Sequence, residues 1–151
     1  MRIVRDDLAG PEIAAFLEEH LREMRSVTPP ESKHALDLDG LRRPDVAVWS
    51  VWDGDTLVGC GALKRLDDDH AEIKSMRTLA ARRRGGVGSL LLRHLVTEAR
   101  RAGCRRLSLE TGSADFYLPA RRLYERHGFR PCEPFADYRH DPNSVYLTLE
   151  L

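Results

Sequence analysis

The sequence has few cysteines and no long hydrophobic run, and each absence excludes a class of protein. Cys60, Cys104 and Cys132 are odd in number, widely spaced and form no Cys-x-x-Cys pair. This pattern argues against a disulfide framework or a structural zinc site and predicts reduced, packed thiols without metal. No apolar run approaches the length of a membrane span, and the N-terminus lacks the hydrophobic core of a signal peptide. We therefore expect a cytoplasmic protein with no membrane partner.

Net charge is also absent. The chain has 24 basic and 24 acidic residues among 151, so no overall field recruits nucleic acid. Positive charge is instead local, as in the arginine run at 82–84, and local charge suits a small polyanion. The length predicts one domain, residues 1–151, that buries roughly two thirds of its unfolded surface.

The glycine-rich loops of two common nucleotide-binding motifs are missing as well. No Gly-Lys pair is followed by serine or threonine, which excludes a P-loop. A dinucleotide fingerprint that uses Gly86 and Gly88 would need a third glycine at position 91, where the chain has Leu91. Glu110 does lie at a suitable spacing for a ribose contact, so this alternative stays open at that residue.

The most informative stretch of the sequence is residues 82–95, read as RRRGGVGSLLLRHL. Three arginines and three glycines lead directly into a leucine-rich helical pattern. The first turn of a helix has unpaired backbone N–H groups and the positive end of the helix dipole. Glycines leave these amides accessible to an anion, and arginines add positive charge. The stretch therefore predicts a site for a phosphorylated ligand.

Three motifs in order resemble the GNAT superfamily of N-acetyltransferases. The pattern Arg83-x-x-Gly86-x-Gly88 resembles the family's pyrophosphate-binding turn. Upstream, residues 71–78 (AEIKSMRT) are similar to its fourth strand, which pairs with the pantetheine arm. Downstream, residues 119–129 (PARRLYERHGF) are similar to a later helix of the family. The matching positions of that helix are Ala120, Leu123, Tyr124, Gly128 and Phe129.

The resemblance implies an α/β GNAT fold: a single mixed, mainly antiparallel sheet flanked by helices, with a coenzyme-binding strand-turn-helix. The expected order is strand, two helices, three strands, helix, strand, helix and two strands. The implied cosubstrate is acetyl-coenzyme A (acetyl-CoA), without metal. The residues expected at the coenzyme are Met76, Arg77, Thr78, Arg83, Arg84, Gly85, Gly86, Val87, Gly88, Ser89 and Ala120.

Acetyl transfer to an amine needs a general base, and Glu72 is the first candidate. It stands six residues before Thr78, in an Ala-Glu-Ile sequence similar to the one that holds the catalytic glutamate of histone-acetylating GNAT members. Strand alternation would place it on the same side as Lys74, Met76 and Thr78. A purely structural role, pairing with Lys74, stays open. Glu110 and His34 are the alternative bases.

The departing thiolate needs a proton donor, and the resemblance assigns this role to Tyr124. A phenol and a thiol have ordinary pKa values of about 10 and 8.5, close enough for proton transfer. The alternative is a tyrosine that only packs its helix on the sheet. Tyr117 stands where many family members have a coenzyme-binding asparagine, which leaves the pantetheine contacts open. The amide of Met76 or Arg77 is the expected partner of the thioester carbonyl.

The sequence therefore predicts an N-acetyltransferase that transfers acetyl from acetyl-CoA directly to a primary amine in a ternary complex. No cysteine occupies an obvious nucleophile position. The alternative function is a GNAT-like module that binds acyl-CoA as a sensor without catalysis. The amine acceptor is not identified, because residues 25–45, which should shape its pocket, contain no interpretable motif. Homodimerisation stays open.

Overall fold

The computed structural model describes residues 1–32 and 35–151. Its described strands form one seven-stranded sheet in the order β1-β2-β3-β4-β5-β7-β6. The strands are β1 (Arg2–Asp6), β2 (Val46–Asp53), β3 (Thr56–Arg65), β4 (His70–Thr78), β5 (Arg106–Gly112), β6 (Arg130–Pro131) and β7 (Ser144–Glu150). The α-helices are α1 (Pro11–Val27), α2 (Leu38–Leu41), α3 (Val87–Arg101) and α4 (Leu118–Arg126). The predicted fold and order of elements are confirmed.

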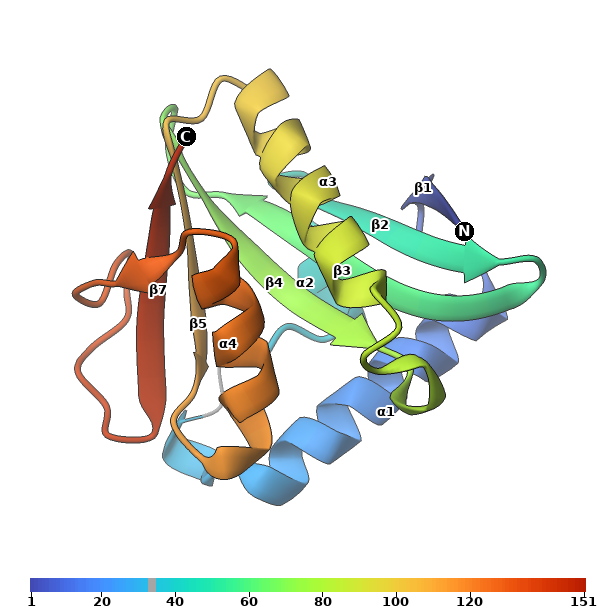
Figure 1. Ribbon diagram of the computed structural model, residues 1–151, viewed down its shortest axis with the longest axis horizontal. Helices are drawn as coiled ribbons and strands as arrows, with labels where there is room; N and C mark the ends of the chain where they lie inside the picture. Colours follow the sequence, from blue (N-terminus) through green and yellow to red (C-terminus); the bar gives the residue numbers. More distant parts are fainter. Residues whose placement is uncertain (33–34) are drawn as a thin grey trace.

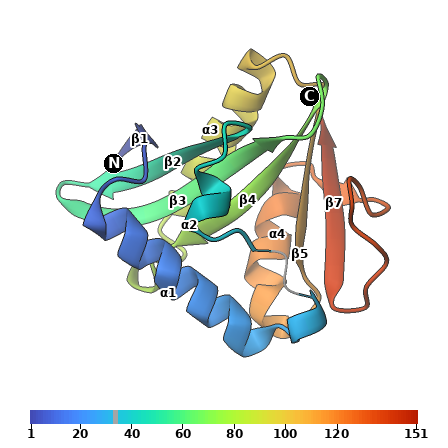
Figure 2. The ribbon, with the colours of Figure 1, turned by 180° about the vertical axis from the view of Figure 1, so that it is seen from behind.

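Helices cover both faces of the sheet. Figures 1 and 2, seen from opposite sides, show α3 and α4 on one face and α1 and α2 on the other. The larger core lies under α3 and α4 and includes Val87, Leu91 and Leu95 of α3, which pack on Ile73 and Leu109 of the sheet. A second core lies under α1. No helix in the described ranges is both long and apolar enough to span a membrane.

The cap residues explain where α3 and α4 begin and end. Gly86 and Gly103 flank α3 with left-handed φ angles of 86° and 84°. Such angles favour glycine, which has no Cβ to clash with the backbone. Pro119 lies in the first turn of α4, where its missing N–H costs no hydrogen bond, and Gly128 follows the helix at φ 93°. The start of α3 and the extent of α4 agree with the motifs at residues 82–95 and 119–129.

The N-terminal helix α1 buries a different face from the one its spacing suggests. The recurrence of Ile13, Leu17, Leu21 and Met24 at helical spacing predicts one apolar face. The structure instead buries Ile13, Phe16, Leu17 and His20. Leu21 and Met24 are only half-buried. For residues 32–41 the sequence favours a short, poorer helix or a turn, and the described residues of this region form a 3-10 turn at Pro30–Ser32 and the one-turn α2.

The sheet splits between β4 and β5, the only parallel neighbours among its described strands. They pair over His70–Ile73 and Arg106–Leu109 alone, although both strands continue further. The other edge of β4 stays paired with β3 as far as Thr78, and β5 stays paired with β7 as far as Gly112. Figure 1 shows the two strands diverging toward α1. We call this divergence of β4 and β5 the strand split.

A β-bulge next to the strand split changes which side chains of β4 share a face. Cys60 pairs with Arg77 and Ala62 with Lys74, so Ser75 and Met76 together oppose a single residue of β3. Ser75 has the left-handed φ of 52° that accompanies this kink. Before the bulge, Glu72 and Lys74 lie on the α1 face, opposite Ile73.

After the bulge, Met76 packs against the core under α3 and α4. Arg77 forms ion pairs with α1. The expectation that Glu72 shares a face with Met76 and Thr78 is therefore wrong. Glycines inside a strand often mark a bulge, and β3 contains Gly59 and Gly61. The bulge beside the strand split lies on the partner strand, because Ser75 adopts the left-handed conformation there.

Candidate functional site

The turn before α3 has the backbone geometry of an anion site. Arg84 and Gly86 both adopt left-handed φ angles, 68° and 86°. No side chain caps the helix, so none competes for the amides of its first turn. A Cβ built on Gly86 would meet no atom within 4 Å, which leaves the approach to these amides open. Alternating backbone conformations of this kind direct N–H groups toward one point and suit phosphate oxygens.

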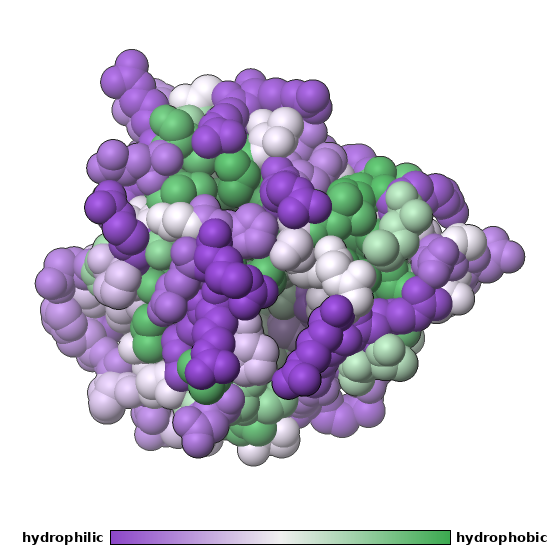
Figure 3. All heavy atoms as spheres, in the orientation of Figure 1, coloured by the Kyte–Doolittle hydropathy of each residue, from purple (hydrophilic) through white to green (hydrophobic). Residues whose placement is uncertain are grey.

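Close packing joins this turn to the end of β4 and to α4. A Cβ on Gly88 would lie 3.0 Å from Leu123 Cδ2 and 3.8 Å from Thr78 Oγ1. A larger residue at Gly88 would therefore push α3 away from α4. The structure thus brings together the three predicted motifs: the strand ending at Thr78, the glycine turn and the helix of Tyr124. Figure 3 shows a hollow on this face between α4 and the turn, with hydrophilic side chains at its rim.

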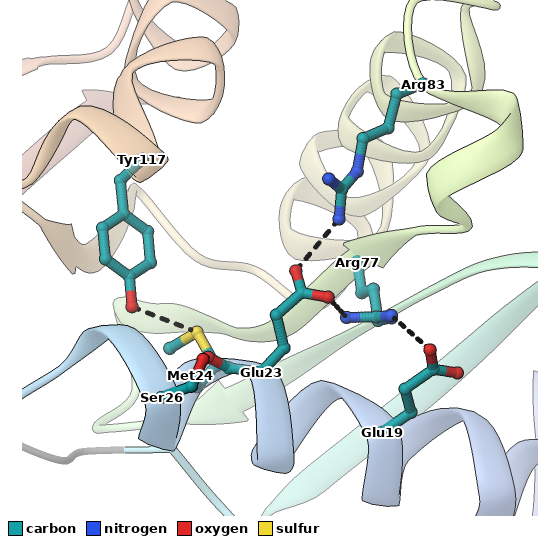
Figure 4. A network of polar contacts seen from close by, with 7 residues as sticks. All are labelled: Glu19, Glu23, Met24, Ser26, Arg77, Arg83 and Tyr117. Atoms are coloured by element: carbon teal, nitrogen blue, oxygen red, sulfur yellow. Dashed lines mark hydrogen bonds and ion pairs between the residues drawn. The ribbon is translucent and has the colours of Figure 1, made fainter.

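Two of the predicted coenzyme arginines contact α1 (Figure 4). Arg83 Nη2 lies 3.0 Å from Glu23 Oε1, and Arg77 Nη1 lies 3.3 Å from Glu23 Oε2. Arg77 also pairs with Glu19 at 3.7 Å, and its guanidinium lies 5.3 Å from the centre of the Phe16 ring. The Arg77 side chain, only 4% exposed, thus points to α1, so any coenzyme contact of this residue falls to its backbone.

Glu23 is a site residue that the sequence analysis missed. Burial acts to raise the pKa of Glu23, but Arg77 and then Arg83 outweigh this effect and hold the pKa below its ordinary value. A carboxylate that joins both arginines fixes the C-terminal half of α1 against β4 and the glycine turn. The sequence feature that could have indicated Glu23 is its i, i+4 spacing from Glu19, which places both carboxylates on one face of the helix.

Tyr124, the predicted proton donor, contacts the part of β4 that extends beyond its pairing with β5. It is buried on α4, and its hydroxyl points at Met76 Sδ, 3.8 Å away, on the strand past the bulge. Burial, with a smaller contribution from Glu110, raises the pKa of Tyr124. The phenol therefore keeps its proton at neutral pH. Ala120, one turn earlier, is half-buried against the same core.

Glu72 is buried on the α1 face with two polar partners. Lys74 Nζ lies 3.3 Å from Glu72 Oε2 and donates a 2.8 Å hydrogen bond to the Tyr138 hydroxyl. Tyr138 in turn donates to Glu72. Burial and then the charge of Glu72 raise the pKa of Tyr138, so it remains a donor. The pairing of Glu72 with Lys74, considered as its structural role, is thus present. Tyr138, from the loop before β7, also contacts Glu72, and no sequence motif indicated this contact.

Glu110 has the properties of a base that works near neutrality. It follows Leu109 at the strand split, on the α1 face, and lines a pocket of about 110 Å³. The pocket is also lined by Leu21, Met24, Arg25, Thr28, Ser32, Ala35, Gly112, Tyr117 and Asn143. Burial raises the pKa of Glu110 to about 7. His34, the other alternative base, lies outside the described residues.

Tyr117 also lines the pocket that contains Glu110. Its hydroxyl forms a 2.6 Å hydrogen bond with Thr28 Oγ1 and approaches Met24 Sδ at 3.5 Å. A Cβ on Gly112 would lie 2.1 Å from the Tyr117 ring, so only glycine fits beneath it. Tyr117 therefore joins α4 to the end of α1, away from the turn that precedes α3.

Within the described parts of the chain, no group of three histidine, cysteine or acidic side chains could hold a metal ion.

The sheet has one parallel strand pair among its described strands. The dinucleotide alternative required repeated parallel βαβ units, so the structure does not fit it.

Comparisons with known proteins agree with this architecture. The model of the acetyltransferase (GNAT) family matches residues 13–129. YsnE of Bacillus subtilis, an uncharacterized N-acetyltransferase, is 54% identical over 151 residues, all of both chains. YedL of Escherichia coli, also an uncharacterized N-acetyltransferase, is 51% identical over 149 residues, 99% of this chain and 94% of that protein.

A solved structure shows the same fold at low sequence identity. The crystal structure of an aminoglycoside 6′-N-acetyltransferase complexed with coenzyme A matches with a TM-score of 0.76 and 17% identity, covering 99% of this chain and 97% of that one. The fold and the close relatives define an acyltransferase. The chain belongs to the acetyltransferase (GNAT) family.

Proposed function

We propose that the protein transfers the acetyl group of acetyl-CoA directly to a primary amine in a ternary complex. The observation that carries this proposal is the strand split, which the candidate acid and base approach from opposite faces of the sheet. Tyr124 approaches from the face of α3 and α4, and Glu110 from the face of α1. Two substrates can thus meet in the opening, each entering from its own side.

The coenzyme side is supported by the turn before α3. The amides of Val87, Gly88 and Ser89 would hold the pyrophosphate, with Arg84 adding charge. The backbone edge from Met76 to Thr78 faces the strand split and can pair with an extended amide ligand. The same edge offers the Met76 or Arg77 amide to a thioester carbonyl. Acetyl-CoA supplies the acetyl thioester, and the chain binds and orients it.

The acceptor side is supported by Glu110. An ammonium acceptor must lose a proton before its nitrogen attacks, and a carboxylate with a pKa of about 7 is both ionised and basic near neutral pH. Tyr124 would donate its proton to the departing coenzyme sulfur. The geometry favours Glu110 over Glu72 as the base, since Glu72 is already held by Lys74 and Tyr138. Glu72 as the base stays a prediction.

The cysteines support direct transfer over an acetyl-enzyme. Cys60 is fully buried, and burial raises its pKa to about 12. Burial also raises the pKa of Cys132. Cys104 is buried and accepts a hydrogen bond from Arg65. A thiol is a nucleophile as its thiolate, so a raised pKa makes it inert.

A charge at Gly86 tests the coenzyme site. Gly86→Asp and Gly86→Asn have nearly the same shape, and both residue types tolerate the left-handed conformation better than most. The open space around this position leaves room for either side chain. We expect Gly86→Asp to bind acetyl-CoA at least about tenfold more weakly than Gly86→Asn, because its carboxylate repels the pyrophosphate at the helix N-terminus.

Isothermal titration of both folded variants gives the comparison, with melting temperatures as the check on folding. Equal affinities for acetyl-CoA in Gly86→Asp and Gly86→Asn would place the pyrophosphate elsewhere. Unchanged turnover in both variants would lead to the same conclusion.

A further inference from the structure

We propose that the acceptor is a small amine that also carries a carboxylate, such as an amino acid, and that Lys64 binds this carboxylate. The inference deepens the proposed function and rests on it. It comes from a second, larger pocket on the α1 face of the sheet, with a volume of about 420 Å³. The pocket is lined by Glu31, Lys64, Glu72, Lys74 and residues 136–141.

This pocket adjoins the candidate base. Leu63, Ile73 and Leu109 point into the core under α3 and α4. Strand alternation therefore directs their neighbours Lys64, Lys74 and Glu110 to the opposite face. Lys74 lines the larger pocket and lies close enough to Glu110 to affect its pKa. Ser32 and Asn143 line the smaller pocket, and both donate hydrogen bonds to Asp141 of the larger pocket. Asn143 also donates a hydrogen bond to Ser32.

Lys64 is the half-buried cation of the pocket lining for which the described residues supply no ion-pair partner. It is half-buried on β3, directly across from Glu72 in the strand register. Glu72 is nevertheless paired with Lys74 and Tyr138 instead. No ion pair joins Lys64 to any other described residue. A partly desolvated ammonium is costly without an anion, so a ligand carboxylate would find a prepared partner there.

The other charges of the pocket do not supply that anion. Glu31 and Asp137 are exposed to solvent at the rim. Asp141 accepts a hydrogen bond from Ser32. His140 pairs with Glu133, outside the pocket lining. Arg139 is exposed and adds a second positive charge at the rim. A ligand with a second ammonium group would bring that group against Lys64, so a diamine fits the pocket poorly.

The spacing suits a ligand whose amine and carboxylate are close together. Lys64 and Glu110 are two strands apart and offset by about two residues along the sheet. With strands about 4.8 Å apart and a rise of about 3.3 Å per residue, regular sheet geometry puts their Cα atoms roughly 12 Å apart, and the divergence of β4 and β5 adds to this distance. Both side chains extend from the same face, so one small molecule between them can contact both. The volume also falls in the range of about 300–1,000 Å³ typical of small-molecule sites.

The test compares amino acids with the amines that remain after removal of the carboxylate: phenylalanine with phenethylamine, and methionine with 3-(methylthio)propylamine. Acetyl-CoA-dependent thiol release gives kcat/KM for each. We expect the parent to prefer the amino acid about 10- to 100-fold, as one charge-assisted contact can supply. Lys64→Met should reduce this preference to within a few-fold of one, and Lys64→Arg should retain part of it. Arg93→Met, which removes an exposed cation on α3, should keep the parental preference.

A second measurement needs no variant. The carboxylic acid without the amine, 3-phenylpropionate, should inhibit the parent competitively against phenylalanine. A parent that acetylates amines as well as amino acids would overturn the proposal, as would a folded Lys64→Met variant with the parental preference. Failure of 3-phenylpropionate to compete would also overturn it. The absence of thiol release with every amine would instead overturn the proposed function on which the inference rests.

Discussion

Replacing Glu110 by glutamine should lower turnover near neutral pH by about 10²–10⁴-fold, the usual contribution of a general base. In the parent, kcat/KM should rise as pH increases through about 7 and level off above it, because the base must be ionised to accept a proton. Glutamine keeps the shape of the side chain but cannot titrate. The variant should therefore lose this rise and recover activity only at high pH, where the free amine becomes abundant.

Glu72→Gln is the matched control for this experiment. It removes a carboxylate from the same sheet face, and that carboxylate is held by Lys74 and Tyr138. If Glu110 is the base, Glu72→Gln keeps the rise in kcat/KM near pH 7. A parental pH profile in Glu110→Gln, together with loss of the profile in Glu72→Gln, would transfer the role to Glu72. Measurements at saturating acceptor separate this effect from weaker amine binding.

Tyr124→Phe should reduce turnover by about 10²-fold while the affinity for acetyl-CoA stays unchanged. The substitution keeps the buried ring and removes only the hydroxyl that points at Met76. The loss should come from the leaving thiolate, which would depart without a proton. Stopped-flow or steady-state turnover gives the rate when chemistry is rate-limiting, and calorimetry gives the coenzyme affinity.

The choice of acetyl donor provides the control for Tyr124. An aryl thioester such as 4-nitrophenyl thioacetate releases a stable thiolate that needs no proton. With this donor, Tyr124→Phe and the parent should acetylate an amine at similar rates. A deficit of the same size with both donors would indicate that the tyrosine only packs α4. Unchanged turnover with acetyl-CoA would remove Tyr124 from the mechanism.

The backbone geometry of the turn before α3 could be predicted from the sequence because its determinants are local. The left-handed Gly86, the packing of Gly88 and the helix boundaries each depend on a few neighbouring residues. Close contacts between α3 and α4 also require small residues at fixed positions, so the motif and the geometry agree. The resemblance singled out Tyr124, and the structure places its hydroxyl 3.8 Å from Met76 Sδ on β4.

The proposed acceptor side was less predictable because its residues are distant in sequence. Strand alternation placed Glu72 beside Met76, but the bulge at Ser75 moves Met76 to the other face. Tyr138 reaches Glu72 from 66 residues away, on a loop without regular structure. Lys64 and Glu110 come from β3 and β5, which are separated in the sheet by β4. Burial, which raises the pKa of Glu110, depends on the packing of the end of α1 and is not visible in the local sequence.

The most direct test of the account is to count thiols and acetylated amines in one reaction. Purified protein is incubated with acetyl-CoA and a panel of amino acids and simple amines. Free thiol is measured with a chromogenic disulfide, and the mass of the acetylated acceptor is determined by mass spectrometry. We predict one thiol released for each acceptor that gains one acetyl group, and no release without an acceptor. Binding of acetyl-CoA without acceptor-dependent thiol release would contradict the account and support an acyl-CoA sensor instead.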